Sequence, residues 1–166
     1  MNKLYNPKSL IYFLLFLLTS CSTTDTNSDN DDALYTINAN FKIIAQGQYS
    51  NISLARELIV KNKKDWRRLW EIHSGNQKQQ RPHVNFDDNM VIAIFSGQQP
   101  SGGYAVGVSK LKRLDDNLTV SVTFKEPQQG KSVSLALTQP YIFISTAKVD
   151  GKVTFVADPS STPIRQ

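Results

Sequence analysis

Hydrophobic positions in the first half of the chain change between strand-like and helix-like spacing. Residues 41–49 and 54–61 are rich in apolar side chains and flank a polar turn, a pattern that predicts two strands. Residues 90–95 form a continuous apolar run, Met-Val-Ile-Ala-Ile-Phe, which is typical of a strand buried on both faces. We therefore expect this run to be the central strand of a sheet.

Residues 63–74, between these strands, have the spacing of an amphipathic helix. Trp66, Leu69, Trp70 and His73 recur at i, i+3, i+4 and i+7, so they share one face. Aromatic residues at helical spacing commonly pack against a sheet, and we prefer that interpretation to a carbohydrate platform or a cofactor site. Suitable capping residues stand at both ends, namely Asn62 and Asp65 at the start and Gly75 after the last turn.

Apolar and polar residues alternate through much of the second half. Residues 104–108 and 118–125 lie on either side of Asp115-Asp116-Asn117, which predicts a β-hairpin with one buried face. Further strands are expected at residues 133–137, 141–146 and 153–156, the last one after a turn at Asp150-Gly151. About seven or eight strands and one helix predict a mainly β fold of the α+β type. The expected architecture is an antiparallel β-sandwich or curved sheet with the amphipathic helix packed on it.

The N-terminus has the pattern of a secretion signal followed by a lipidation site. Residues 1–8 contain two lysines and no acid, and the apolar residues 10–18 would span only about half of a membrane's hydrocarbon core. Leu-Thr-Ser-Cys at residues 18–21 resembles the lipobox of bacterial lipoproteins, and Cys21 is the only cysteine in the chain. We expect a signal peptide at residues 1–20 and a lipid on Cys21 that anchors the mature protein to the cell envelope. The alternative is an ordinary signal peptide with an unrelated cysteine.

The rest of the chain divides into a tether, one domain and a tail. Residues 22–32 contain no apolar side chain and cannot offset the entropy of ordering, so we expect residues 21–33 to be a disordered acidic tether. Residues 34–158 suffice for one β-rich domain with a single core, followed by a polar tail at 159–166. Because the chain has one cysteine, this domain has no intrachain disulfide. Ser22 after the cysteine resembles the sorting signal of enteric-type lipoproteins for the outer membrane.

Charge is unevenly distributed along the chain. The formal net charge is +5, but the part from residue 34 onward carries 17 Lys and Arg against 10 Asp and Glu, or +7. A basic domain suits an acidic partner or an anionic membrane surface, and an ordinary solvated surface is an equally good interpretation. Nucleic acid is a poor candidate partner, because the lysines are scattered and an exported protein rarely meets nucleic acid.

Few residues in the chain could support catalysis or metal binding. The two histidines, His73 and His83, lack the spacing that places two metal ligands on one helix face. A zinc ion held by His73, His83 and Asp87, or an envelope enzyme that uses either histidine, remains a minor alternative. Ser101 beside two glycines is typical of a turn, and the chain has no nucleophile elbow or phosphate-binding glycine loop. We therefore expect no enzymatic activity, no metal and no other cofactor.

Two loops with a proline and an aromatic residue are the best candidates for a binding site. Gly97-Gln98-Gln99-Pro100-Ser101-Gly102-Gly103-Tyr104 follows the expected central strand, and Thr138-Gln139-Pro140-Tyr141 joins two later strands. Proline stiffens the backbone, while glycine permits positive φ and the close approach of another backbone. The alternative is that both are plain strand connections. The predicted partner-binding residues are Pro100, Ser101, Gly102, Gly103, Tyr104, Pro140 and Tyr141.

The order of these elements resembles the C-terminal domain of the PrcB family. Trp66-Arg67-Arg68-Leu69-Trp70 is similar to the family's Trp-x-x-Leu-Trp helix, and Asn85-Phe86-Asp87 and residues 90–97 to the acidic step and apolar strand that follow it. Pro100-Ser101-Gly102-Gly103-Tyr104 resembles its Pro-Thr-Gly-Gly-Tyr loop, with serine in place of threonine. Leu137-Thr138-Gln139-Pro140-Tyr141 resembles its Thr-x-Pro-Tyr element. The resemblance implies a lipoprotein subunit that accompanies and stabilises a secreted or surface protease.

A weaker resemblance connects the same two loops with chagasin-type inhibitors of cysteine peptidases. Those immunoglobulin-like domains present an Asn-Pro-Thr-Thr-Gly-Tyr loop and an Arg-Pro-aromatic loop at one end. Residues 99–104 and Gln139-Pro140-Tyr141 are similar to these loops in part. This resemblance implies peptidase inhibition as an alternative function.

Overall fold

The computed structural model describes residues 36–75 and 79–159. The chain divides into the units Met1–Asp32 and Ala33–Gln166, and all described residues belong to the second unit. The predicted signal peptide, Cys21, the tether and the end of the polar tail lie outside the described residues. Within residues 36–75 and 79–159, no helix has the length and apolar character needed to cross a membrane.

The described residues form eight strands and one helix. The strands are β1 (Ile37–Asn38), β2 (Phe41–Gly47), β3 (Arg56–Val60), β4 (Asn89–Phe95), β5 (Ala105–Leu114), β6 (Asn117–Lys125), β7 (Tyr141–Ala147) and β8 (Val153–Ala157), and the helix is α1 (Lys63–Ser74).

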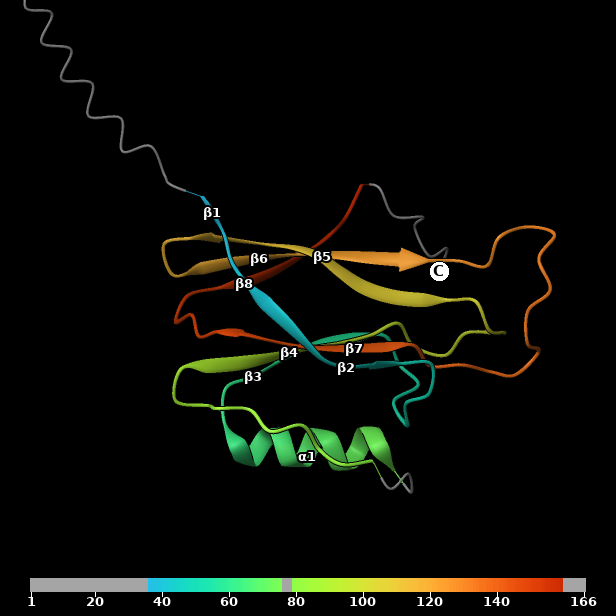
Figure 1. The fold of residues 1–166 in the computed structure, drawn as a ribbon, viewed down its shortest axis with the longest axis horizontal. Coiled ribbons are helices and arrows are strands. Elements are labelled where there is room, and N and C mark those ends of the chain that lie inside the picture. The colour runs from blue at the N-terminus through green and yellow to red at the C-terminus, as the bar shows by residue number, and fades with distance from the viewer. Residues whose placement is uncertain (1–35, 76–78, 160–166) are drawn as a thin grey trace, which may run out of the picture. The chain divides into compact units, whose positions relative to one another are not determined.

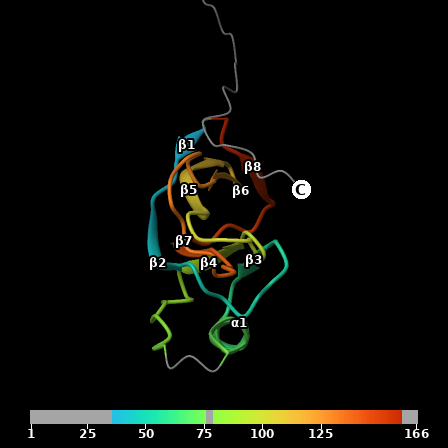
Figure 2. The ribbon, with the colours of Figure 1, turned by 90° about the vertical axis from the view of Figure 1, so that its right-hand side faces the viewer.

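Two four-stranded sheets pack face to face, and α1 covers the outer face of one of them (Figure 1, Figure 2). One sheet has the strand order β1-β5-β6-β8, and the other, next to the helix, has the order β2-β7-β4-β3. All neighbouring strands are antiparallel except β6 and β8, which are parallel. The predicted mainly β sandwich with one packed helix is confirmed.

Strand β4 is apolar from Met90 to Phe95 because it separates two hydrophobic cores. Met90, Ile92 and Ile94 belong to the core between the two sheets. Val91 and Phe95 point the other way and belong to the core between the second sheet and α1. Successive side chains of a strand point to opposite faces, so a strand covered on both sides needs apolar residues at every position. The expected central strand is confirmed, with β7 and β3 on either side of it.

Helix α1 forms over the predicted residues and buries the predicted face. Asn62 caps it by accepting a hydrogen bond from the Asp65 backbone at 2.9 Å. Trp66 and Trp70 are 2% and 5% exposed, and both rings contact Phe143 of β7. The interpretation of the tryptophans as core residues is therefore confirmed, and an exposed tryptophan platform is excluded.

The strand expected at residues 133–137 is wrong. This part of the chain belongs to a long connection between β6 and β7, where only Thr138 forms an isolated bridge, to Gln99. Leu135 is 92% exposed and Leu137 is 55% exposed. Alternation alone does not make a strand, because the backbone also needs a neighbouring strand with free hydrogen-bonding groups.

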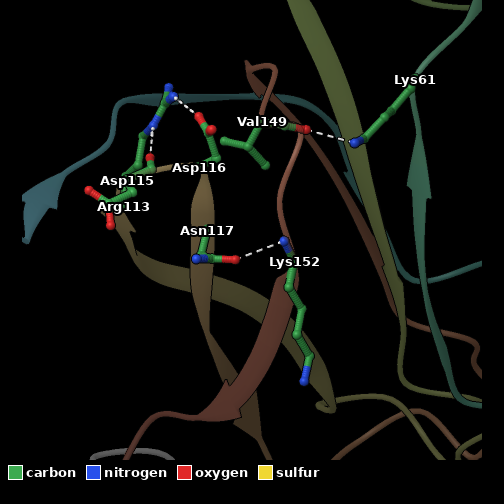
Figure 3. Close-up of polar contacts among 7 residues, drawn as sticks. All are labelled: Lys61, Arg113, Asp115, Asp116, Asn117, Val149 and Lys152. Atoms are coloured by element: carbon green, nitrogen blue, oxygen red, sulfur yellow. Dashed lines mark hydrogen bonds and ion pairs between the residues drawn. The ribbon is translucent and has the colours of Figure 1, made fainter.

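Polar contacts link the predicted turn between β5 and β6 with the predicted turn before β8 (Figure 3). The guanidinium of Arg113 donates to the Asp115 carbonyl at 2.7 Å and pairs with the Asp116 carboxylate at 3.2 Å. The side-chain oxygen of Asn117 accepts a hydrogen bond from the Lys152 backbone at 2.9 Å. The Arg113 contacts lie within the β5–β6 turn, and the Asn117–Lys152 bond ties this turn to the connection that leads into β8. Both predicted turns, at residues 115–117 and 150–151, are thereby confirmed.

Candidate binding surface

Three connections meet at one end of the sandwich, and we call this surface the loop end (Figure 1). It comprises residues 48–55 between β2 and β3, residues 96–104 between β4 and β5, and residues 126–140 between β6 and β7. The strand register places them together, because Tyr141 at the start of β7 lies opposite both Gly47 and Phe95. The two proline-containing loops predicted to form one edge therefore lie side by side.

Backbone hydrogen bonds hold the three connections together. Gln99 and Thr138 exchange two such bonds, at 2.7 and 3.0 Å. The Gly102 amide donates to the Ser134 carbonyl at 2.8 Å, and the Gln98 amide donates to the Ser53 carbonyl at 2.9 Å. The Thr138 hydroxyl also donates to the Ser101 carbonyl at 2.8 Å. These bonds restrain loops that would otherwise lose conformational entropy when a partner binds.

The paired glycines are explained by packing within the loop end. Gly103 has a φ of +88°, and a Cβ atom there would lie 3.1 Å from Pro127 and 3.2 Å from Val133. A Cβ atom on Gly102 would lie 3.3 Å from Ser134. The backbone that approaches these glycines is thus the protein's own residues 127–134. Replacing either glycine would disturb this packing, so other residues are better probes of partner contact.

Some of the predicted partner-binding residues lie at the surface, and others are buried. Pro100 and Gly103 are exposed, and Ser101, Gly102 and Tyr104 are half-buried. Pro140 and Tyr141, by contrast, are buried. The surface role predicted for these last two residues is therefore corrected.

Tyr141 belongs to the core beneath α1. Its ring lies 4.1 Å from the ring of His73 and 5.4 Å from that of Phe143, measured between centroids. Burial raises the pKa of the Tyr141 hydroxyl above its ordinary value of 10.0. Tyr141 is only 5% exposed, so its side chain supports the loop end from within the core and does not offer a contact surface.

Four exposed apolar side chains at the loop end were not predicted to be functional. They come from two of the three connections: Tyr49 (51% exposed), Leu54 (65%), Leu135 (92%) and Leu137 (55%). Only Glu126 and Lys131 are charged in the three connections together. A surface with few charges and large exposed apolar side chains is typical of a protein contact site. The signal in the sequence was Pro127 and Gly130, which argue for a loop before the leucines.

The two histidines and Asp87 do not come together as a metal site. His73 is buried in α1, where its Nδ1 lies 2.9 Å from the Ser50 hydroxyl oxygen and its Nε2 has no hydrogen-bond partner. Burial lowers the pKa of His73 from 6.5 to about 4. His83 and Asp87 are exposed in the connection after the helix, and no group of three metal-ligating side chains occurs among residues 36–75 and 79–159. The proposed His73, His83 and Asp87 zinc set is therefore not assembled.

The two-sheet architecture and the loop end define a β-sandwich domain with exposed apolar side chains at one end. Residues 90–147, from β4 through β7, match the family model described as PrcB C-terminal. This match confirms the predicted relationship with the PrcB family, and it includes two of the three connections of the loop end. No curated protein and no solved structure is significantly similar to the chain.

Proposed function

We propose that this protein is a lipid-anchored, non-catalytic binding module that stabilises or accompanies a secreted or surface protease. The loop end carries the proposal, because it combines a restrained backbone with exposed, uncharged apolar side chains. The PrcB C-terminal match supports a subunit associated with a protease complex. Exposed leucines on a rigid support bury apolar area on docking at a small entropic cost.

The loop end can be tested by replacing Leu135 with serine. Leu135 is 92% exposed, so the free energy of unfolding should change by no more than about 0.5 kcal/mol. If Leu135 contacts the protease, the affinity measured by titration calorimetry should fall by about ten-fold or more. The probe is the purified protease encoded beside this protein or recovered with it from detergent extracts.

Ile37→Ser is the matched control for this measurement. Ile37 is 54% exposed on β1 and pairs with Arg113, far from the loop end along β5. The control should leave the affinity unchanged. Equal affinities for wild type, Leu135→Ser and Ile37→Ser would remove the loop end from the interface and contradict the proposal.

A peptidase inhibitor is a second candidate, because the two loops that resemble chagasin-type loops do lie side by side. The two functions differ in one measurable respect. A stabilising subunit should lengthen the half-life of protease activity without lowering its turnover. An inhibitor should lower turnover when present at near-equal concentration. The burial of Tyr141, the aromatic residue of the second loop, favours the stabilising function.

We also propose that Cys21 carries the lipid and that the domain is displayed at the cell envelope, in the outer membrane. The lipobox resemblance at residues 18–21 and the polar stretch that follows support this proposal. Mass spectrometry of the mature protein should show an N-terminal Cys21 bearing a diacylglyceryl group and an acyl chain. Cys21→Ser should abolish both the lipid and the cleavage after Ser20. An unmodified Cys21, or cleavage at another bond, would contradict the anchoring.

A further inference from the structure

A second surface, beside α1, is rich in positively charged side chains, unlike the loop end. A cavity of about 340 Å³ lies between α1 and the connection that follows it. Three cationic side chains, a histidine and no acidic residue line it together with apolar groups. The lining residues that matter here are Lys63, Arg67, Arg81 and His83.

Two tryptophan indoles of α1 hold residues 79–82, which include Arg81, against the helix. Trp66 Nε1 donates to the Pro82 carbonyl at 3.1 Å, and Trp70 Nε1 donates to the Gln79 carbonyl at 3.2 Å. Arg81 lies between these two anchored positions, so its backbone is kept beside α1. Lys63 and Arg67 are four residues apart on α1 and therefore share one side of the helix. Positive charge from two separate segments thus converges on one cavity.

None of these cationic side chains forms an ion pair with another described residue. The one ion pair within residues 36–75 and 79–159 joins Arg113 to Asp116, at the β5–β6 turn. Asp65, the nearby acid of the first helical turn, accepts a hydrogen bond from the Asn62 side chain at 2.7 Å. Like charges at i and i+4 repel each other, and a bound anion relieves that repulsion.

We propose that this cavity binds a phosphate group through Lys63, Arg67 and Arg81. Two guanidinium groups supply planar pairs of donors that match phosphate oxygens, and the lysine adds a point charge. A multivalent oxyanion suits three cations better than a single carboxylate does. The site is independent of the loop end and would give the protein a ligand in addition to its protein partner.

Calorimetric titration of the mature protein in a neutral detergent and low-salt buffer tests the proposal. Inorganic phosphate should bind with a dissociation constant in the millimolar range, and acetate should bind more weakly. Arg67→Gln and Arg81→Gln should each weaken phosphate binding by about ten-fold or more, because each removes a charge-assisted hydrogen-bonding group. Glycerophosphoglycerol, the headgroup of an anionic lipid, is the second probe. Its binding would identify a lipid as a source of the phosphate, and its failure to bind alongside phosphate would identify a free phosphate or phosphomonoester.

Arg68→Gln is the matched control, since it removes the same charge one position further along α1 and does not line the cavity. It should change phosphate affinity by less than about two-fold, as expected for a screened surface charge. Equal losses in Arg67→Gln and Arg68→Gln would show a general charge effect and overturn the site. Absence of phosphate binding, or equal affinity for acetate, would overturn it as well. Leu135→Ser should leave phosphate binding intact, so this proposal and the protease proposal can fail separately.

Discussion

Replacing Trp70 with alanine is expected to lower the free energy of unfolding by about 3–5 kcal/mol. The indole is 5% exposed, packs against Phe143 and His73, and donates a hydrogen bond to Gln79. Its removal would leave a cavity between α1 and β7 and would release the connection that follows the helix. Urea denaturation followed by far-UV circular dichroism measures the change, and the thermal midpoint should fall by on the order of 10 °C.

Arg68→Ala provides the comparison for Trp70→Ala. Arg68 is exposed on the same helix, and alanine is a good helix former, so stability should change by no more than about 0.5 kcal/mol. If both variants unfold at the wild-type urea concentration, α1 does not pack on the sheet through its tryptophan face. The same result would remove the support that holds Arg81 beside the phosphate cavity.

Protonation of His73 is expected to lower the free energy of unfolding in mild acid. Burial lowers its pKa in the folded protein to about 4, from 6.5 when the side chain is free in the unfolded chain. Between these two values the unfolded state binds more protons than the folded state, so stability falls as the pH decreases. The contribution is fully present above pH 6.5 and is lost as the pH falls to about 4. A shift of this size corresponds to a loss of about 3 kcal/mol.

His73→Phe separates this effect from the titration of the carboxylates. Phenylalanine keeps a ring among Trp70, Tyr141 and Phe143 but cannot take up a proton. The variant gives up the contact with Ser50, whose hydroxyl oxygen still accepts a hydrogen bond from the Ile52 amide at 3.1 Å. Urea denaturation of both proteins between pH 7 and pH 4 should show a smaller loss in the variant. Parallel stability curves would mean that His73 takes up its proton equally easily in both states.

If the protein is displayed at the envelope, the acid sensitivity of His73 would act on the same core that supports the loop end. His73 contacts Tyr141, which lies directly beneath the connections at residues 96–104 and 126–140. Protonation of His73 would give its ring a positive charge within this aromatic cluster. The ring's Nε2 has no hydrogen-bond partner that could stabilise this charge. Loss of partner binding in acid should therefore accompany unfolding and should not precede it.

The helix and the central strand were determined by the sequence, because their signals are local. The helical spacing of Trp66 and Trp70, with Asn62 at one end and Gly75 at the other, specifies α1 without knowledge of distant residues. The apolar run of β4 likewise required burial on both faces, whatever covered them. The PrcB resemblance was carried by the same segments and the loop after β4, and the family match covers β4 from residue 90 and that loop but not α1.

Tertiary structure alone decided which side chains reach the surface. Leu135 and Leu137 have the alternation of a strand, yet they pair with no neighbouring strand and remain exposed. Tyr141 lies beside a proline in a promising loop, but the register between β4 and β7 turns it toward α1. The parallel pairing of β6 with β8 and the placement of Arg81 beside Lys63 and Arg67 depend on contacts between segments distant in sequence. Periodicity identifies the buried face of an element, whereas its neighbours determine what covers that face and which residues are left for a partner.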